Sequence, residues 1–139
     1  MMTTRTIPAP PVNPENTRFF AAAERGELLV GQCRACSKPH FYPRARCPYC
    51  LSDAVDWIAA RGSGTLYAFS TLRRGTPVPY TLAYVRLDEE VTMLTNIVDA
   101  DARTLAIGMR VRLVFKTTDG GPPVPMFTPD DSPAEETKR

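Results

Sequence analysis

Cys33-Arg34-Ala35-Cys36 and Cys47-Pro48-Tyr49-Cys50 are the two stretches that decide how this chain folds. They contain all four cysteines of the 139-residue sequence, as two C-x-x-C pairs separated by ten residues. Each C-x-x-C turn directs two thiolates at one ion, and two such turns complete a tetrahedron of sulfurs. All-sulfur tetrahedral coordination favours zinc, with iron as the less common alternative. The spacing therefore predicts a zinc site made of Cys33, Cys36, Cys47 and Cys50.

The predicted metal has a structural role, because four thiolates leave no open coordination position for water or substrate. His40 lies between the pairs and could replace one cysteine, although a place on the connecting turn is the simpler interpretation. A redox C-x-x-C normally occurs once and would not explain the second pair. Disulfides are disfavoured because residues 1–14 lack the apolar run of a secretory signal, so we expect a cytoplasmic protein.

The charge of the chain is nearly balanced, at a formal +2, which argues against a general polyanion binder. Its distribution is uneven, because residues 34–86 contain only two acidic side chains. An anionic partner could meet this part of the chain, and a solvated basic surface is the alternative. The eight basic residues of the segment are Arg34, Lys38, Arg44, Arg46, Arg61, Arg73, Arg74 and Arg86.

The first half of the chain is predicted to form a disordered segment, a helix and a ribbon. Residues 1–12 are rich in Pro and Thr and are expected to be disordered. The helix, within 13–26, begins at Pro14 after an Asn13 cap and ends at Gly26. Short strands at 27–32, 41–43 and 54–58 then surround the cysteines. They predict a rubredoxin-like zinc ribbon over 27–61 with little apolar core of its own, followed by a flexible junction at 61–64.

After this junction the apolar residues recur with a period of two, which is typical of strands. We predict strands at 65–72, 80–87, 91–98 and 110–116, a helical turn within 101–107 and a last strand at 125–127. Short antiparallel strands in this order favour a Greek-key barrel of OB-fold type over 62–127. The chain is therefore predicted to be mostly β, with a disordered tail at 128–139.

This order of elements resembles the zinc-ribbon/OB-fold acyl-CoA-associated proteins, a family first catalogued as a domain of unknown function. The resemblance covers residues 15–127 and is most specific at the cysteines. It departs from the family at Ser37 and Leu51, where glycine is usual because the turn needs a left-handed backbone. Besides the cysteine pairs it rests on Phe19-Phe20, Gly26-Glu27-Leu28, Phe41-Tyr42-Pro43-Arg44, Trp57, Gly64-Thr65-Leu66-Tyr67 and the stretches 80–85, 94–97 and 107–111.

The resemblance implies a non-catalytic accessory subunit of a thiolase-like enzyme, one that condenses, transfers or cleaves acyl groups in acyl-CoA metabolism. Such a subunit would bind or position acyl-CoA and act as a scaffold for the complex. In the helix, Phe19 and Phe20 are the candidates for docking on the partner. CoA carries phosphates and an adenine, which arginines beside an aromatic ring can bind. The candidates for this contact are Arg44, Arg46, Arg73, Arg74 and Tyr80.

Independent catalysis is not predicted from this sequence. It has one histidine, no cysteine outside the two pairs, no G-x-S-x-G motif and no P-loop lysine. A scaffold without any CoA contact would have the same sequence features as the accessory subunit.

Single-stranded nucleic-acid binding is the alternative function, because zinc ribbons and OB barrels both serve it. The aromatic residues available for stacking on bases are Tyr67, Phe69, Tyr80 and Tyr84. They alternate with apolar residues as core strands do, and the overall charge is nearly neutral, so this function is disfavoured.

Overall fold

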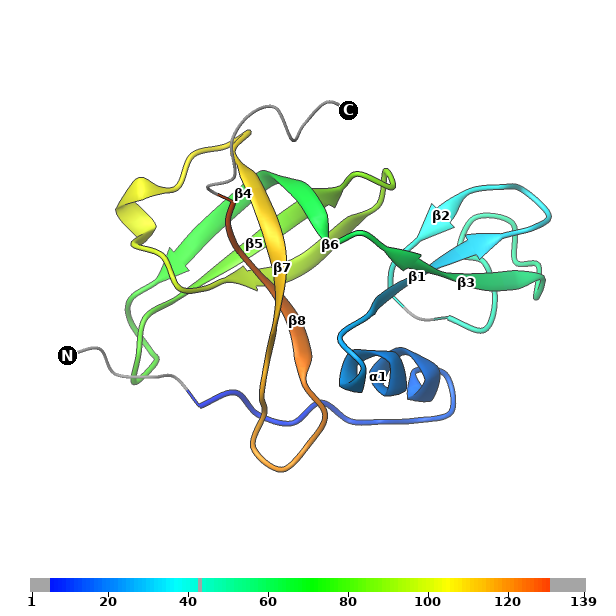
Figure 1. Cartoon of the computed structure of the whole chain (residues 1–139), viewed down its shortest axis with the longest axis horizontal. Helices are drawn as coiled ribbons and strands as arrows, with labels where there is room; N and C mark the ends of the chain where they lie inside the picture. Colours follow the sequence, from blue (N-terminus) through cyan, green and yellow to red (C-terminus); the bar gives the residue numbers. More distant parts are fainter. Residues whose placement is uncertain (1–5, 43, 131–139) are drawn as a thin grey trace.

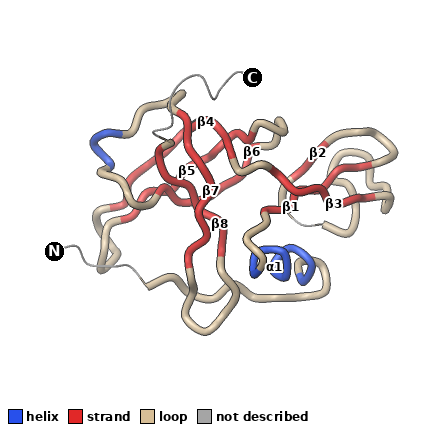
Figure 2. Tube along the Cα trace, in the orientation of Figure 1, coloured by secondary structure: helices blue, strands red, loops and turns tan. Residues whose placement is uncertain are grey.

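The computed structural model describes residues 6–42 and 44–130, in which a helix and a three-stranded ribbon precede a closed barrel (Figure 1 and Figure 2). The helix and ribbon elements are α1 (Thr17–Glu24), β1 (Leu28–Cys33), β2 (Pro39–His40) and β3 (Val55–Ala60). The barrel elements are β4 (Ser63–Leu72), β5 (Tyr80–Leu87), β6 (Thr92–Ile97), β7 (Arg110–Lys116) and β8 (Val124–Pro129), with the 3₁₀ turn η1 (Ala102–Thr104) between β6 and β7.

Helix α1 begins three residues later than the sequence predicted and ends at Glu24, two residues before the predicted stop at Gly26. The Asn13 side chain caps a turn, accepting hydrogen bonds from the amides of Glu15 and Asn16 at 2.9 and 3.0 Å. This local turn occupies the residues before Thr17, so the helix can start only after it. At the other end Gly26 has a φ of +80°, which closes the helix in a left-handed cap.

The ribbon sheet has the order β2-β1-β3, with both pairs antiparallel. The second ribbon strand along the chain was predicted at 41–43. This is wrong at Phe41 and Tyr42, which follow β2, and residue 43 lies outside the described residues. The pairing with β1 ends at His40 because the next two rings turn away to pack on Phe19, each with its centroid 5.6 Å from that ring.

Strand β1 joins the ribbon to the main hydrophobic core. Leu28, Leu29 and Val30 are consecutive and all buried, so both faces of the strand are covered. They belong to one cluster with Phe19 of α1 and Leu66 of the barrel. The expectation of a ribbon with little core beneath it is therefore wrong, because β1 shares the core of the helix and the barrel.

The barrel has the strand order β4-β5-β6-β8-β7 and is closed by pairing of β7 with β4. This confirms a mostly β chain with an OB-type barrel, and the bounds of β5 and β7 agree with the prediction. Strand β8 reaches Pro129, so the tail predicted at 128–139 is ordered as far as residue 130. At the other end, Pro8 forms a bridge with Asp119, which orders part of 1–12. Residues 1–5 and 131–139 lie outside the described residues.

The junction between ribbon and barrel is tightly packed, contrary to the flexible link that was predicted. Ser63 already belongs to β4, and the amide of Arg61 donates to Oε2 of Glu89 at 3.0 Å. A Cβ atom at Gly62 would lie 2.8 Å from Cβ of Leu113, and one at Gly64 would lie 2.7 Å from a backbone carbonyl oxygen. The glycines are needed here for close packing rather than for flexibility.

Candidate functional site

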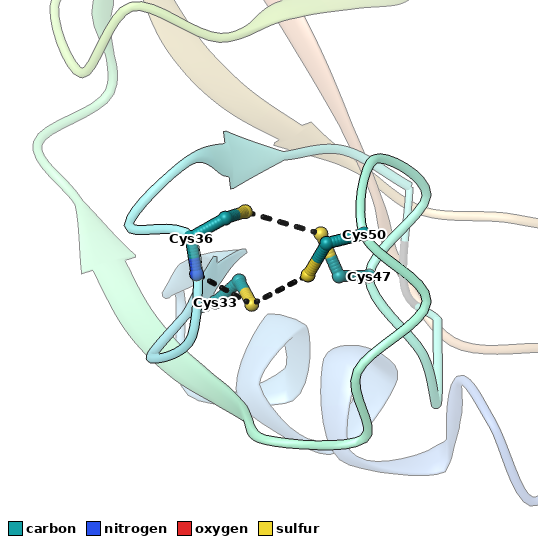
Figure 3. Close-up of side chains that lie close together, drawn as sticks. All are labelled: Cys33, Cys36, Cys47 and Cys50. Carbon is teal, nitrogen blue, oxygen red and sulfur yellow. Dashed lines mark hydrogen bonds between the residues drawn. The ribbon is translucent and has the colours of Figure 1, made fainter.

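The four cysteines meet at the tip of the ribbon, with their Sγ atoms all within 4.8 Å of one another (Figure 3). The sulfurs of Cys33 and Cys50 are 3.6 Å apart, and those of Cys36 and Cys47 are 3.7 Å apart. A zinc ion with bonds of about 2.3 Å to four sulfurs separates them by about 3.8 Å, so the donor set fits zinc. These separations are too long for disulfide bonds, and all four thiols are free.

Backbone amides of the two turns favour thiolates at this site. The Sγ atom of Cys33 accepts hydrogen bonds from the amides two and three residues further along the chain, and the Cys36 amide is the main cause of its lowered pKa. Burial opposes ionisation of Cys47, but amide hydrogen bonds from Cys50 and Tyr49 lower its pKa to about 7. A metal must displace the remaining protons when it binds. Once bound, it would be held by four sulfurs and would stabilise the ribbon.

Ser37 and Leu51 occupy equivalent left-handed positions directly after the two cysteine pairs. Both have a φ of +67°, the region that favours glycine. Their amides donate to the carbonyl oxygens of Cys33 and Cys47, each at 2.9 Å, which closes the two turns. The metal site is thus built on two strained turns of the same shape.

His40 is not a metal ligand in this arrangement. Its side chain is 2% exposed, packs on Gly31 of the neighbouring strand and finds no hydrogen-bond partner for either ring nitrogen within the described residues. Burial, together with the charge of Arg44, lowers its pKa. This burial could not be predicted from the sequence, because a single histidine between two cysteine pairs is compatible with several positions.

The five residues proposed to contact CoA fall into two separate groups. Arg44 lines a 440 Å³ hollow beside Trp57, and Arg46 donates to the carbonyl oxygen of Leu51, so both belong to the ribbon. The loop between β4 and β5 lies at the end of the barrel away from the ribbon (Figure 1). It carries the exposed Arg73 and Arg74, and Tyr80 lines a 430 Å³ cavity at that end. One ligand site therefore does not include both groups.

The two phenylalanines proposed to dock on a partner are buried in this chain. Phe19 is 2% and Phe20 is 4% exposed, and their rings pack edge to face with centroids 5.0 Å apart. The docking prediction is corrected at these residues, because so short a helix uses its apolar face to pack on its own core.

Exposed apolar residues lie instead on the outer face of the barrel, although the alternation of Tyr67 and Tyr84 with apolar residues is typical of core strands. Tyr67 and Tyr84 are 64% and 48% exposed, and Leu94, paired with Tyr84 across β5 and β6, is 53% exposed. Tyr84 and Leu94 form one side of a 520 Å³ groove. One feature of the sequence could have indicated this exposed apolar face. Strand β5 has apolar residues on both faces, whereas a half-buried strand usually has polar residues on one of them.

No helix among residues 6–42 and 44–130 has the length and apolar character needed to cross a bilayer.

The closed barrel and the four-sulfur ribbon define this chain as a zinc-ribbon/OB-fold protein. Two family models match it in the order of the structure. The rubredoxin-like zinc ribbon domain of ChsH2 matches residues 20–56, and the C-terminal OB-fold domain of ChsH2 matches residues 57–116. The chain belongs to this ChsH2 family, and its four clustered cysteines are the metal-binding site of the zinc ribbon.

Relatives of the chain include enzyme subunits and scaffold proteins. It is 31% identical to a probable enoyl-CoA hydratase alpha subunit of Thermomonospora curvata, over 88% of this chain but only 40% of that protein. It is 28% identical to a DUF35 domain-containing scaffold protein of Methanothermobacter thermautotrophicus, over 67% of this chain and 74% of that protein. A chain of the solved Ltp2-ChsH2(DUF35) aldolase superposes with a TM-score of 0.75 at 31% identity, over 86% of this chain and 98% of that chain.

Proposed function

We propose that this chain is a non-catalytic accessory subunit of a thiolase-like enzyme of acyl-CoA metabolism. Its role is to bind or position the CoA ester and to hold the complex together as a scaffold. The observation that carries this proposal is the similarity to almost the whole of a chain from the Ltp2-ChsH2(DUF35) aldolase, at 31% identity. The names of the relatives are consistent with a partner that acts on acyl-CoA substrates.

The chemistry of the described residues supports an accessory role. General acid–base or nucleophilic catalysis needs an activated side chain within reach of a substrate. The four cysteines are held in the metal site, and His40 is buried without a hydrogen-bond partner among the residues that the structure describes. The reaction itself would therefore depend on groups of the partner enzyme.

We place the CoA contact at the barrel end that carries Arg73, Arg74 and Tyr80. Two exposed guanidinium groups on one loop suit phosphates, and the cavity beside them is lined by Tyr80. Among the described residues, the ribbon hollow contains one carboxylate, Glu15, which accepts a hydrogen bond from the Ala45 amide. The part of the barrel cavity that the structure describes contains two, Asp99 and Asp101, and each is already paired with a cation, Lys116 or Arg103, at 2.8 Å.

The partner is tested by capture of the tagged chain from an extract of its native cell, with the bound proteins identified by mass spectrometry. Recovery of a thiolase-like enzyme of acyl-CoA metabolism is the expected result. Recovery of nucleic acid or ribosomal proteins would instead favour the alternative function, for which the exposed Tyr67 and Tyr84 offer stacking surfaces.

The CoA contact is tested by calorimetric titration of the captured complex with CoA. We expect the double variant Arg73→Ala/Arg74→Ala to bind CoA at least about tenfold more weakly, because charge-assisted contacts to phosphate are lost. The matched double variant Arg44→Ala/Arg46→Ala, with its zinc content verified, should bind CoA as the unchanged chain does. The opposite result would move the contact to the ribbon.

A further inference from the structure

A 520 Å³ groove runs between the ribbon and the outer face of the barrel. On one side it is lined by aromatic rings of α1 and of the segment after β2, including Phe20, Phe41 and Tyr42. On the other side it is lined by Tyr84 of β5 and Leu94 of β6. Its volume lies within the range of about 300–1,000 Å³ that is usual for small-molecule sites.

Among residues 6–42 and 44–130, those that line this groove include no charged side chain, although the chain as a whole is 23% charged. An anionic or cationic group would lose its hydration there without gaining a counter-charge, so the matching ligand is uncharged and largely hydrocarbon. One polar group is oriented by the protein. The buried Nδ2 of Asn16 donates to the Tyr42 hydroxyl oxygen at 3.4 Å, which leaves the Tyr42 proton free for an oxygen of a ligand.

The size of the groove favours a small ligand over a second copy of the chain. A stable protein interface needs about 800 Å² and 20–30 residues on each side. Eleven of the described residues line this groove, about half of that number.

The groove and the CoA contact proposed above lie along the same strand, because Tyr84 lines the groove and Tyr80 lines the cavity at the barrel end. Tyr80, Leu82 and Tyr84 alternate along β5 and therefore point to the same outer face. This face extends over about 13 Å from the end that carries Arg73 and Arg74 to the groove. A CoA ester bound by its phosphates at the arginines can extend along β5 and place its acyl group in the groove.

From this alignment along β5, and from the uncharged lining, we infer that the groove binds the apolar acyl group of a CoA ester. The inference rests on the proposed function and specifies its substrate class as esters of hydrophobic acids. Tyr42 is the hydrogen-bond donor to an oxygen on the acyl group.

The test uses the full-length chain and the neutral fluorophore N-phenyl-1-naphthylamine, which reports binding without involving the arginines. Leu94→Glu places a charge in the groove, and Thr92→Glu does the same at a second exposed lining position. The matched control is Ile107→Glu, since Ile107 is 63% exposed and lies outside the groove. We expect the fluorophore to bind the unchanged chain and the control, and to bind the two groove variants at least about tenfold more weakly.

Competition then identifies the ligand class. Decanoyl-CoA should displace the fluorophore, and CoA should not. Decanoyl-CoA should also bind more tightly than butanoyl-CoA, by roughly fourfold for each additional methylene that is fully buried. Fluorophore binding that is unchanged in both groove variants, or no displacement by decanoyl-CoA, would overturn the inference. Loss of the partner enzyme from Leu94→Glu with unchanged fluorophore binding would also overturn it, because the groove would then be a protein interface. Each of these results is separate from partner capture by the unchanged chain, on which the proposed function depends.

Discussion

Ser37 and Leu51 carry a conformational cost that the metal site does not require. Both residues have a φ of +67°, which costs an L-residue about 1–2 kcal/mol, whereas glycine adopts it freely. The cost is partly offset because glycine loses more backbone entropy on folding. We therefore expect Ser37→Gly and Leu51→Gly each to raise the free energy of unfolding by about 0.5–1 kcal/mol, measured by urea denaturation of the zinc-loaded chain.

Ser70→Gly is the matched control for this prediction. Ser70 is exposed on β4, where the backbone is extended, so glycine there should lower the stability by about 0.5–1 kcal/mol. Equal effects at all three positions would mean that the left-handed turns are not strained.

The buried imidazole of His40 makes stability depend on pH. Burial, with a contribution from Arg44, holds its pKa below the ordinary value of 6.5 in the folded chain. The unfolded chain takes up a proton near pH 6.5 and the folded chain does so only at lower pH, so acid favours unfolding. The contribution of His40 to stability is therefore complete above pH 6.5 and is lost as the pH falls toward the folded pKa.

Unfolding free energies of the unchanged chain and of His40→Phe at pH 7.5, 6.5 and 5.5 test this prediction. The unchanged chain should lose stability relative to the variant as the pH falls, and titration of the cysteines cancels in the difference. Parallel pH profiles would show that His40 does not titrate between these values.

At the scale of elements, Gly62 couples the ribbon to the barrel by close packing. Its φ of +84° resembles the +93° of Gly108, so alanine meets similar backbone strain at both positions. Only at Gly62 would the added Cβ meet a neighbour, Cβ of Leu113 at 2.8 Å, whereas nothing lies within 4 Å at Gly108. We expect Gly108→Ala to cost about 1–2 kcal/mol and Gly62→Ala to cost about 1–3 kcal/mol more, measured by urea denaturation. Equal costs would mean that Leu113 shifts easily to accommodate the added Cβ atom at Gly62.

Elements whose signals are local could be predicted from the sequence, and those set by tertiary contacts could not. The C-x-x-C spacing predicted the metal site, and the alternation in β5 and β7 predicted both strands. The start of α1 was misplaced because a turn at Asn13 competes with helical hydrogen bonds. The ribbon strand at 41–43 was misplaced because packing on Phe19 overrides the extended preference of the aromatic residues.

The candidate ligand surfaces also depend on tertiary contacts that could not be predicted from the sequence. The basic residues were visible in the sequence, but their separation into a ribbon group and a barrel group depends on where β4 ends. Tyr84 was interpreted as core because it alternates with apolar residues, as residues of core strands do. Only the barrel closure decides which face of β5 is buried.

Across the whole molecule, one hydrophobic cluster unites the zinc ribbon with the barrel. Leu28 and Val30 of the ribbon belong to the same buried cluster as Leu66 and Val85 of the barrel. Structural zinc contributes about 10–16 kcal/mol to the folding of zinc-finger peptides, which is comparable to the whole stability of a small domain. Removing the metal should therefore destabilise the barrel as well as the ribbon that binds it.

Thermal unfolding with and without a zinc chelator tests this coupling with two probes. Fluorescence of Trp57, the single tryptophan, reports on the ribbon, and far-ultraviolet circular dichroism reports mainly on the barrel strands. With zinc bound, we expect both probes to show one coincident transition, and chelation should lower both midpoints together. The variant Cys33→Ser/Cys47→Ser controls for other effects of the chelator, because it lacks two of the four ligands. A barrel transition that stays at its original temperature while the Trp57 signal is lost would contradict the coupling, and the shared cluster would then contribute little to the cooperativity of folding.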